Sequence, residues 1–336
     1  MIILTVLVCI LSVYFIFYLL YPFFQVLIYN FKNSEQVKYS SKETDVACII
    51  TAYKESDIVL PLVDSLLKQN YQNYLIYVVA DNCDTSKLKF SSEKVIVLKP
   101  PNIIGSKFKS IYFGIENFIR PHKALAIFDS DNLAHPDFLK ETNNYLTDNY
   151  VAVQGKRKAK NLNTKTACLD SANETYYNFT DREFNFRFGS SSALAGSGMT
   201  FEVSVYEKSL KDKKIVGGFD KILQYEVVNS GYRIAFAANA IVYDEKVAES
   251  DQVVKQRTRW INSWFKYAYM GVILLFKGVL SFNLNKILFS LMLIRAPLFI
   301  IVLSSLFLSF IVFFIDIYSF AILFFSVIMF VVSFLL

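Results

Sequence analysis

The chain has 336 residues, of which 54% are hydrophobic and only 19% are charged, and its formal net charge is +6. This balance argues against an ordinary soluble domain. The four cysteines show no spacing typical of a zinc site or a disulfide framework, and no interleaving of basic and aromatic residues indicates a nucleic-acid partner.

The first 31 residues carry no charged side chain. They lack the basic start of a signal peptide and are longer than its apolar core, so we expect residues 1–32 to form a retained transmembrane helix. Basic residues follow this segment and precede the tail. They are Lys32, Lys38 and Lys42 on one side, and Lys255, Arg257, Arg259, Lys266, Lys277 and Lys286 on the other. By the positive-inside rule, both flanks of the central region are cytoplasmic and the N-terminus is outside.

The C-terminal tail is the second apolar region, and Asp316 is its only charged residue after Ala296. Residues 286–336 fit two transmembrane helices, the first of which is kinked near Pro297. Arg295 is interpreted as a residue that snorkels to the membrane interface. The basic residues beside the predicted spans indicate that membrane lipids of an anionic leaflet are a partner.

Between these ends, residues 33–255 have mixed composition and are long enough for one sheet-centred domain. Apolar runs that predict strands alternate with stretches that predict helices, which favours a doubly wound α/β core with a mostly parallel sheet. The predicted strands are 46–52, 75–80, 95–98, 124–129, 150–154 and 234–243. The predicted helices are 56–69, 106–119, one from residue 136, 164–188, and one from 220 to about 231.

Asp129 and Asp131 stand at the end of the fourth predicted strand. Open α/β sheets bind ligands outside the carboxyl ends of their strands. Two carboxylates one residue apart at such an end can reach one hard cation, so this segment predicts a Mn²⁺ or Mg²⁺ site for a metal-bound diphosphate. The alternative is an acidic turn without a metal, because aspartate is common in turns. Asp81 ends the second strand in the same way, although it too could simply begin a turn.

Gln256-Arg-Thr-Arg259-Trp260 matches the Gln-x-x-Arg-Trp motif of the membrane-integrated family 2 glycosyltransferases, which include cellulose, chitin and hyaluronan synthases. The Asp-x-Asp segment also resembles the metal motif of that family. The resemblance covers residues 46–264 and implies a GT-A fold, with a cytoplasmic domain flanked by transmembrane helices. Physically, an arginine can neutralise a diphosphate leaving group, and a tryptophan offers a sugar an apolar face.

The alternative for the Gln-x-x-Arg-Trp segment is a basic and aromatic belt at a membrane surface. Both interpretations can hold together if residues 256–285 form an amphipathic interfacial helix whose first turn faces the active site.

The resemblance implies further roles in the same site. Asp81 is implied to bind the uracil and ribose of the donor, and Tyr53 and Glu55 lie in a segment that resembles the one wrapped around the base. Gly196-Ser-Gly198 is interpreted as a short flexible turn whose backbone can approach a sugar, and the family has such a loop on the acceptor side. The alternatives are a solvated loop for Glu55 and an ordinary turn for the glycines.

Asp220 falls on the aspartate of the family's Glu-Asp pair, which precedes a helix that ends at a glycine. The resemblance therefore implies that Asp220 is the catalytic base, with Glu226 as the second choice. Phe219 replaces the glutamate of the pair, which is a departure from the family's pattern. A carboxylate at a helix start can also be a plain cap.

These observations predict an inverting, metal-dependent glycosyltransferase. It would transfer a sugar from a nucleotide sugar, UDP-linked by the resemblance, to a glycan or lipid-linked acceptor in cell-surface polysaccharide synthesis at a bacterial cytoplasmic membrane. Phe219 favours a second hypothesis, a catalytically inactive nucleotide-binding membrane scaffold of a polysaccharide synthesis complex. A channel is disfavoured because the spans are few and almost uncharged. Family synthases that make polymers usually carry more spans, so we expect either transfer to a lipid-linked or growing glycan or export through a partner or an oligomer.

Overall fold

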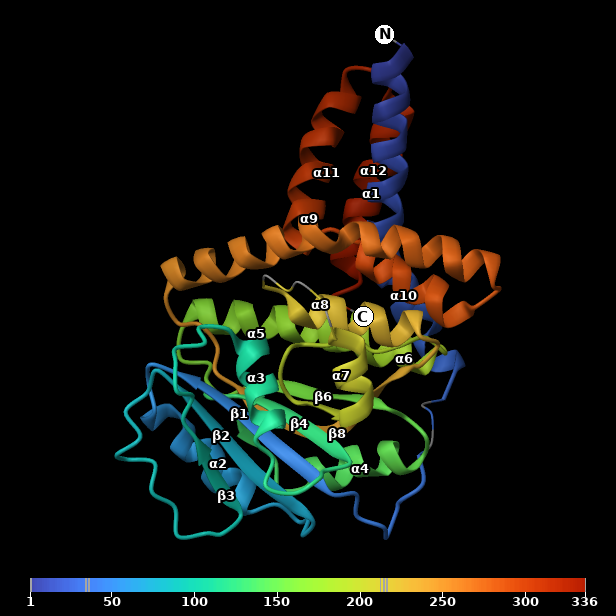
Figure 1. Ribbon diagram of the computed structural model, residues 1–336. Coiled ribbons are helices and arrows are strands. Elements are labelled where there is room, and N and C mark those ends of the chain that lie inside the picture. The colour runs from blue at the N-terminus through green and yellow to red at the C-terminus, as the bar shows by residue number, and fades with distance from the viewer. Residues whose placement is uncertain are drawn as a thin grey trace.

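The computed structural model describes residues 2–33, 35, 37–211, 213, 215 and 217–335. Figure 1 shows a domain built around a sheet, a long helix across it, and a helical bundle above. The strands are β1 (Val46–Tyr53), β2 (Tyr74–Asp81), β3 (Val95–Leu98), β4 (Ala124–Asp129), β5 (Leu133–Ala134), β6 (Ala152–Ala159), β7 (Met199–Glu202) and β8 (Ile234–Asp244). The domain helices are α2 (Leu60–Leu67), α3 (Lys107–Glu116), α4 (Phe138–Thr147), α5 (Lys165–Tyr177), α6 (Phe184–Arg187), α7 (Val203–Leu210) and α8 (Phe219–Asn229). Shorter elements are the 3₁₀ turns η1 (Tyr29–Phe31) and η2 (Asp57–Val59) and the π-helix η3 (Asn178–Glu183) between α5 and α6.

The strands form one sheet in the order β3-β2-β1-β4-β7-β6-β8-β5. The neighbours β3, β2, β1 and β4 are parallel, which confirms the expected α/β class, whereas β7 and β5 pair antiparallel with their neighbours. The prediction lacked β5, β7 and α7. Strands of two and four residues are too short to show a periodic pattern, and α7 follows β7 without a break.

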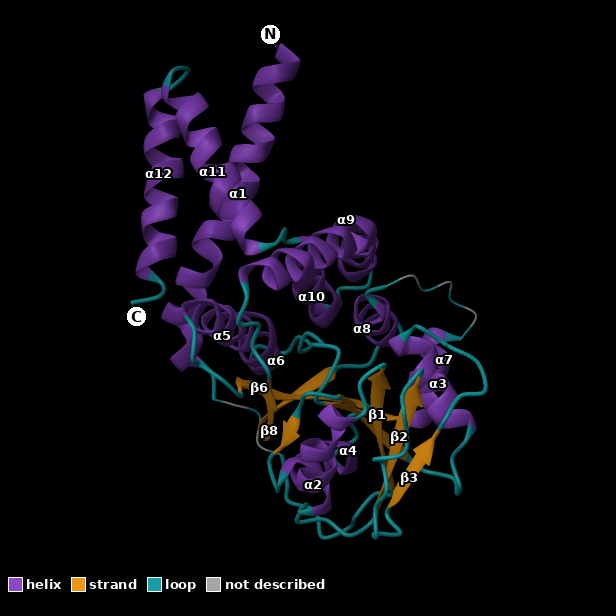
Figure 2. Cartoon of the chain, turned by 90° about the vertical axis from the view of Figure 1, so that its left-hand side faces the viewer, coloured by secondary structure: helices purple, strands orange, loops and turns teal. Residues whose placement is uncertain are grey.

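Both faces of the sheet are buried, so its central strands are continuous apolar runs. Ile50 and Phe128 belong to a cluster with residues of α2 and α4, while Ile49 and Ile127, one residue earlier, belong to a cluster with residues of α3, α7 and α8. Side chains alternate between the two faces along a strand, which separates the two clusters. Figure 2 shows the two sets of helices on opposite sides of the strands.

A buried hydrogen-bond chain closes the amino ends of the central strands. His122 lies 2.8 Å from Asp45 through Nδ1 and 2.9 Å from the Tyr77 hydroxyl through Nε2, and its side chain is fully buried. Burial lowers the pKa of His122 below its usual value despite the carboxylate of Asp45. His122 precedes β4, whereas Asp129 ends this strand, so the hydrogen-bond chain lies at the opposite end of the strand from the paired aspartates.

Outside the domain, α9 (Ser250–Leu280) leads into α10 (Leu284–Ile294). The bundle contains α1 (Ile2–Ile28), α11 (Leu298–Phe313) and α12 (Ile317–Val332), and it rises steeply from α9 (Figures 1 and 2). Among the described residues, one helix, Thr5–Phe31, is long and apolar enough to cross a membrane. Helices α10 and α11 meet that criterion only together, with a bend of 67° between them, and α12 is a shorter apolar helix.

The tail therefore differs from the single kinked helix expected around Pro297. Helix α10 packs along α9, where a Cβ on Gly271 would come within 2.9 Å of the Leu293 Cβ, and α11 begins in a new direction. Proline disfavours helical backbone in the residue before it, which explains the break. The expectation that Arg295 snorkels is wrong, because its side chain is buried and donates to Asp181 at 2.7 Å.

Candidate active site

The predicted donor-binding residues lie where three parallel strands end. In the sheet register, Tyr53 of β1 pairs with Asp81 of β2, and Thr51 of β1 pairs with Asp129 of β4. Tyr53 is 49% exposed, and Glu55 is also exposed. The structure thus gathers these residues at one carboxyl edge of the sheet, as expected for a ligand site in such a fold.

Asp81 holds a loop at this edge. Its carboxylate accepts hydrogen bonds from the backbone N–H groups of Ile104 at 2.9 Å and Gly105 at 2.7 Å, and the residue is only 1% exposed. The loop runs directly into α3, which begins at Lys107. Asp81 has the position that the sequence indicated, but its carboxylate orients the start of α3 rather than facing open space.

Lys107 lies at the centre of the site, although no local sequence pattern predicts it. Its ammonium forms an ion pair with Asp129, donates to the Gly196 carbonyl at 2.7 Å and lies 5.8 Å from the centre of the Phe219 ring. Burial alone would raise the pKa of Asp129, but Lys107 holds it below its usual value. Lys107 therefore joins the Asp-x-Asp segment, the glycine loop and the start of α8.

Asp131 has no ion pair like the one that Lys107 forms with Asp129, among the residues that the structure describes. Burial, together with the negative charges of Asp129 and Asp244, raises the pKa of Asp131 to about 6. The side-chain nitrogen of Asn132 donates to the Asp131 carboxylate at 3.2 Å, and the side-chain oxygen of Asn132 accepts from the Asp129 backbone N–H at 3.1 Å. A carboxylate held beside two others would gain from a divalent cation, which is the observation that fits a metal here.

The donor set also fits a metal that arrives with a diphosphate. In the part of the chain that the structure describes, no group of three or more Asp, Glu, His or Cys side chains could hold a metal ion. Mg²⁺ takes one or two carboxylates and completes its shell with phosphate oxygens and waters, and Mn²⁺ favours the same oxygen ligands. Asp129 and Asp131 are the residues that would hold such an ion.

The loop Gly196-Ser-Gly198 is held at several points, in contrast to the flexible turn expected from the sequence. The Gln154 side chain binds three backbone groups of residues 195–198 at 2.8–3.1 Å. Arg157 and Lys107 bind two further carbonyls of the loop, at 3.0 and 2.7 Å. A Cβ on Gly196 would meet no atom within 4 Å, so the loop presents a fixed backbone to open space.

Asp220 lies in the first turn of α8 and is partly exposed. Gly218 precedes this helix with a φ of +61°, and a Cβ there would lie 2.2 Å from the Ser263 hydroxyl of α9, so only glycine fits. One turn further along α9, Tyr267 donates to the backbone carbonyl that precedes Gly218, at 3.1 Å. Helix α9 therefore packs on the start of α8 and fixes the predicted base.

The Gln-x-x-Arg-Trp motif lies within α9 rather than at its first residue. Gln256 is partly buried, Arg259 is exposed, and Trp260 is 44% exposed. The arginine that faces the domain is Arg257, which pairs with Asp170 of α5 at 2.6 Å and lies 4.4 Å from the centre of the Trp260 ring. Among the described residues, no hydrogen bond or ion pair joins the motif to Asp129 or Lys107, so its role at the leaving group stays a prediction.

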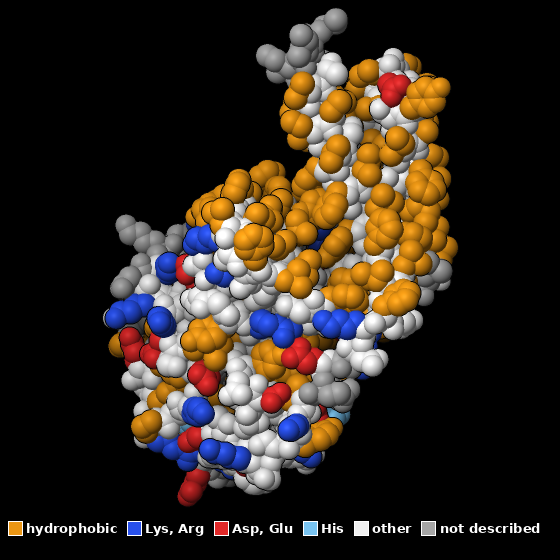
Figure 3. All heavy atoms as spheres, turned by 90° about the vertical axis from the view of Figure 1, so that its right-hand side faces the viewer, with side chains coloured by type: hydrophobic (Ala, Val, Ile, Leu, Met, Phe, Trp, Pro, Cys, Tyr) orange, Lys and Arg blue, Asp and Glu red, His pale blue; other side chains and the backbone are white. Residues whose placement is uncertain are grey.

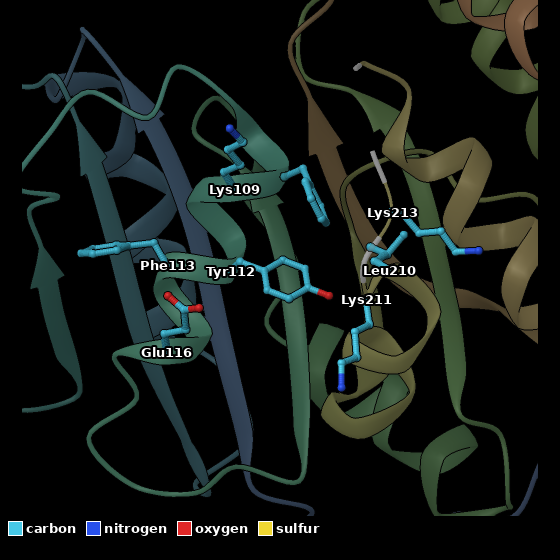
Figure 4. Close-up of a pocket in the computed structure, with 8 residues that line it drawn as sticks. Lys109, Tyr112, Phe113, Glu116, Leu210, Lys211 and Lys213 are labelled. Atoms are coloured by element: carbon cyan, nitrogen blue, oxygen red, sulfur yellow. The ribbon is translucent and has the colours of Figure 1, made fainter. Parts of the chain in front are cut away.

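A separate cavity of about 450 Å³ lies between α3 and α7. Figure 4 shows Tyr112 pointing from α3 toward Leu210 and Lys211, and its hydroxyl donates to the Glu207 carbonyl at 3.1 Å. None of the predicted site residues lines this cavity, because it lies along the flank of α3 and not at the strand ends. It is therefore separate from the candidate active site.

The fold of the chain resembles the folds of solved proteins. The chain is similar to the mannosyltransferase PcManGT from Pyrobaculum calidifontis in complex with GDP-Man and Mn²⁺, with a TM-score of 0.62 and 13% identity over 94% of this chain and 85% of that chain. It is also similar to residues 1–349 of S. aureus TarS, with a TM-score of 0.47 and 12% identity over 69% of this chain and 65% of that chain.

At 13% identity, the likeness to the mannosyltransferase structure establishes the GT-A type of fold alone. A search of curated proteins gives no significant match. The protein-family profile described as "Glycosyltransferase like family 2" matches residues 44–263, which is more than half of the chain and includes the sheet, the paired aspartates and the start of α9. The chain therefore belongs to the glycosyltransferase-like family 2, whose members use nucleotide sugars.

Proposed function

We propose that this chain is an inverting glycosyltransferase that needs Mn²⁺ or Mg²⁺ and uses a glycan or lipid-linked acceptor. One set of contacts supports the proposal: Lys107 reaches Asp129, the Gly196 carbonyl and the Phe219 ring. Because Phe219 precedes Asp220, these contacts bring the paired carboxylates into the neighbourhood of a partly exposed carboxylate. A diphosphate site beside such a base is what a single displacement requires.

In the proposed reaction, Asp220 takes the proton from an acceptor hydroxyl while the hydroxyl oxygen attacks the anomeric carbon of the donor. The bond from that carbon to the diphosphate breaks on the opposite face, so the configuration inverts and the nucleoside diphosphate leaves. An ordinary ionised aspartate suffices, because the hydroxyl becomes acidic only as it attacks. Lys107 and Arg259 supply positive charge beside the leaving group, and Trp260 offers the sugar an apolar face.

The other site residues bind or orient. Asp129 and Asp131 would hold the metal, which offsets negative charge on the donor diphosphate when bound. Residues 53–55 would border the nucleotide, and Asp81 orients the loop behind it. The fixed backbone of residues 196–198 would face the acceptor, so that its hydroxyl approaches Asp220 in a limited range of orientations.

The experiment that tests this proposal measures nucleotide release by the purified full chain. The donor panel includes GDP-mannose, which the similar mannosyltransferase binds, and UDP-sugars, which the sequence resemblance implies. We expect turnover of one donor with Mn²⁺ or Mg²⁺ and none with EDTA. Binding of a donor without turnover would favour the inactive scaffold, for which Phe219 in place of glutamate is the specific reason. Absence of both binding and turnover would reject both functions.

We further propose that the bundle crosses a bilayer, while α9 and α10 lie along its cytoplasmic surface. Large apolar side chains are exposed on both parts. They include Val13, Leu303, Phe307 and Phe310 in the bundle and Phe265, Tyr269, Val272 and Phe276 on α9. Figure 3 shows apolar side chains over the bundle and the adjoining surface, with Lys and Arg side chains below them. An anionic leaflet would match this arrangement, and export of a polymer through so few helices would need a partner or an oligomer.

The membrane proposal predicts on which side of the membrane each segment of the chain lies. Reporter fusions can therefore test it. A reporter fused near Ser34, a position outside the described residues, should score as cytoplasmic, and one at the N-terminus should score as external. Because the sheet domain follows residue 34 directly, an external result at this position would place the candidate site on the wrong side of the membrane and would contradict the proposal.

A further inference from the structure

Beneath the paired aspartates lies a buried cluster of charged side chains that the proposed reaction does not use. Its members are Arg157 of β6, Glu174 of α5, Arg182 of η3, Asp244 of β8 and Lys246. Arg157 and Lys246 pair with Asp244, and Arg182 and Lys246 pair with Glu174 at 2.6 and 3.4 Å. Burial disfavours the charge on Arg157, but Glu174 and Asp244 outweigh it and raise its pKa. The cost of removing these charges from water offsets most of the attraction between them, so the cluster adds little net stability. We therefore consider a functional role for its geometry.

The cluster contacts the paired aspartates through one residue. Asn132, which is 1% exposed, donates from its side-chain nitrogen to Asp244 at 3.1 Å and to Asp131 at 3.2 Å, and it accepts from the Asp129 backbone. The orientation of Asn132 therefore depends on Asp244, and the orientation of both carboxylates depends on Asn132. Side chains that hydrogen-bond to metal ligands, without binding the metal themselves, fix the orientation of those ligands.

The opposite end of the cluster lies on the π-helix η3, beside the bundle. Arg182 of η3 donates to Glu174, while its neighbour Asp181 pairs with Arg295 at the break between α10 and α11. Gln25 of α1 donates to a backbone carbonyl of η3 at 3.1 Å. Short π-helices are frequent at functional sites. Adjacent residues of η3 thus contact the charged cluster on one side and the bundle and its connection to α10 on the other.

We propose that Arg182 is a positioning residue for the metal site, and that η3 couples this site to the bundle. The inference rests on the proposed function, because it takes Asp129 and Asp131 to hold the metal. Without Arg182, Glu174 is left with Arg157 and Lys246 alone, so these two cations shift toward it and away from Asp244. Asn132 then loses its fixed acceptor, and the carboxylates lose their orientation.

The test measures Mn²⁺ binding to the full chain with GDP or UDP present, from the electron paramagnetic resonance signal of free Mn²⁺. Arg182→Met is expected to weaken Mn²⁺ binding about tenfold. The matched control is Arg187→Met, because Arg187 lies nearby on α6 and packs on the Tyr29 ring without touching the cluster. The control should bind Mn²⁺ within about twofold of the native chain. Native binding by Arg182→Met, or equal weakening by both variants, would overturn the inference.

The coupling to the bundle is tested by a double variant, Asp181→Asn with Arg295→Gln. Removing both charges together leaves neither one buried without a partner, so the chain should still fold. We expect Mn²⁺ binding to weaken about fivefold, at the low end of couplings between distant sites, and unchanged binding would reject the coupling. A native chain that binds no Mn²⁺ with either nucleotide would instead reject the proposed function itself, whatever the Arg182 variant does.

Discussion

Replacing Asp220 with asparagine is expected to lower kcat by about 10²–10⁴-fold, because a positioned general base contributes about that much. The amide keeps the shape of the carboxylate but cannot take the proton from the acceptor hydroxyl. Donor and metal binding should stay within about twofold, since Asp129, Asp131 and Lys107 keep their contacts. Nucleotide release measured over a range of donor concentrations separates kcat from KM and checks both expectations.

The matched control for this variant is Glu226→Gln. Glu226 lies in the last turn of the same helix, and it pairs with Lys213 at 2.7 Å on the side of the α7–α8 connection. Its replacement should leave kcat within about twofold. If Glu226→Gln lost activity while Asp220→Asn kept it, the base would be Glu226 and the assignment of Asp220 would be wrong.

Replacing Asp131 with asparagine is expected to have two opposite effects. Turnover should fall at least about 100-fold, because only one carboxylate of the pair remains to hold the metal. The metal-free protein should become more stable at pH 7.5 by about 1–2 kcal/mol, a figure reduced from the full pKa difference because solvent screens a partly exposed group.

The sign of the stability effect follows from proton binding. The pKa of Asp131 is raised to about 6 in the folded chain, whereas an unfolded chain has a value of about 4. Between these values the folded state binds more protons, so the native chain loses stability as the pH rises through about 6. Asparagine removes this loss, and the gain should therefore be present at pH 7.5 and nearly absent below pH 4.

Thermal unfolding in EDTA at several pH values checks this expectation, with Asp129→Asn as the control. That variant should also lose turnover, but it should not be stabilised, because Lys107 then loses its carboxylate partner. A native chain that unfolds at a higher temperature than Asp131→Asn at pH 7.5 would show that Asp131 is not held at an electrostatic cost.

Strand ends were the part of the site that the sequence could predict. Asp81 and Asp129 each follow a continuous apolar run, and parallel strands bring such ends together, so their common edge follows from the local pattern. The assignment of Asp220 as the base rests only on a resemblance, because a carboxylate at a helix start is also an ordinary cap. The structure adds that Gly218 fits only as glycine beneath Ser263 of α9, a contact between residues 45 positions apart in the chain.

The residues that the sequence did not predict have partners in distant segments of the chain, so no local pattern indicates them. Lys107 has no distinctive neighbours in sequence, and its importance comes from the loop that Asp81 holds and from the approach of β4. Arg157 and Lys246 look like ordinary surface cations in the sequence, yet they are buried against Asp244. Arg295 was misinterpreted for the same reason, because its partner Asp181 lies 114 positions earlier in the chain.

Around the paired aspartates, positively and negatively charged side chains are equal in number before any ligand binds. Four cations, Lys107, Arg157, Arg182 and Lys246, accompany four carboxylates, Asp129, Asp131, Glu174 and Asp244. A divalent cation alone would leave this region with excess positive charge, and a nucleoside diphosphate alone would leave it with excess negative charge. The two together would change the balance little, so under the proposed function we expect the site to bind a metal and a diphosphate together more tightly than either one alone.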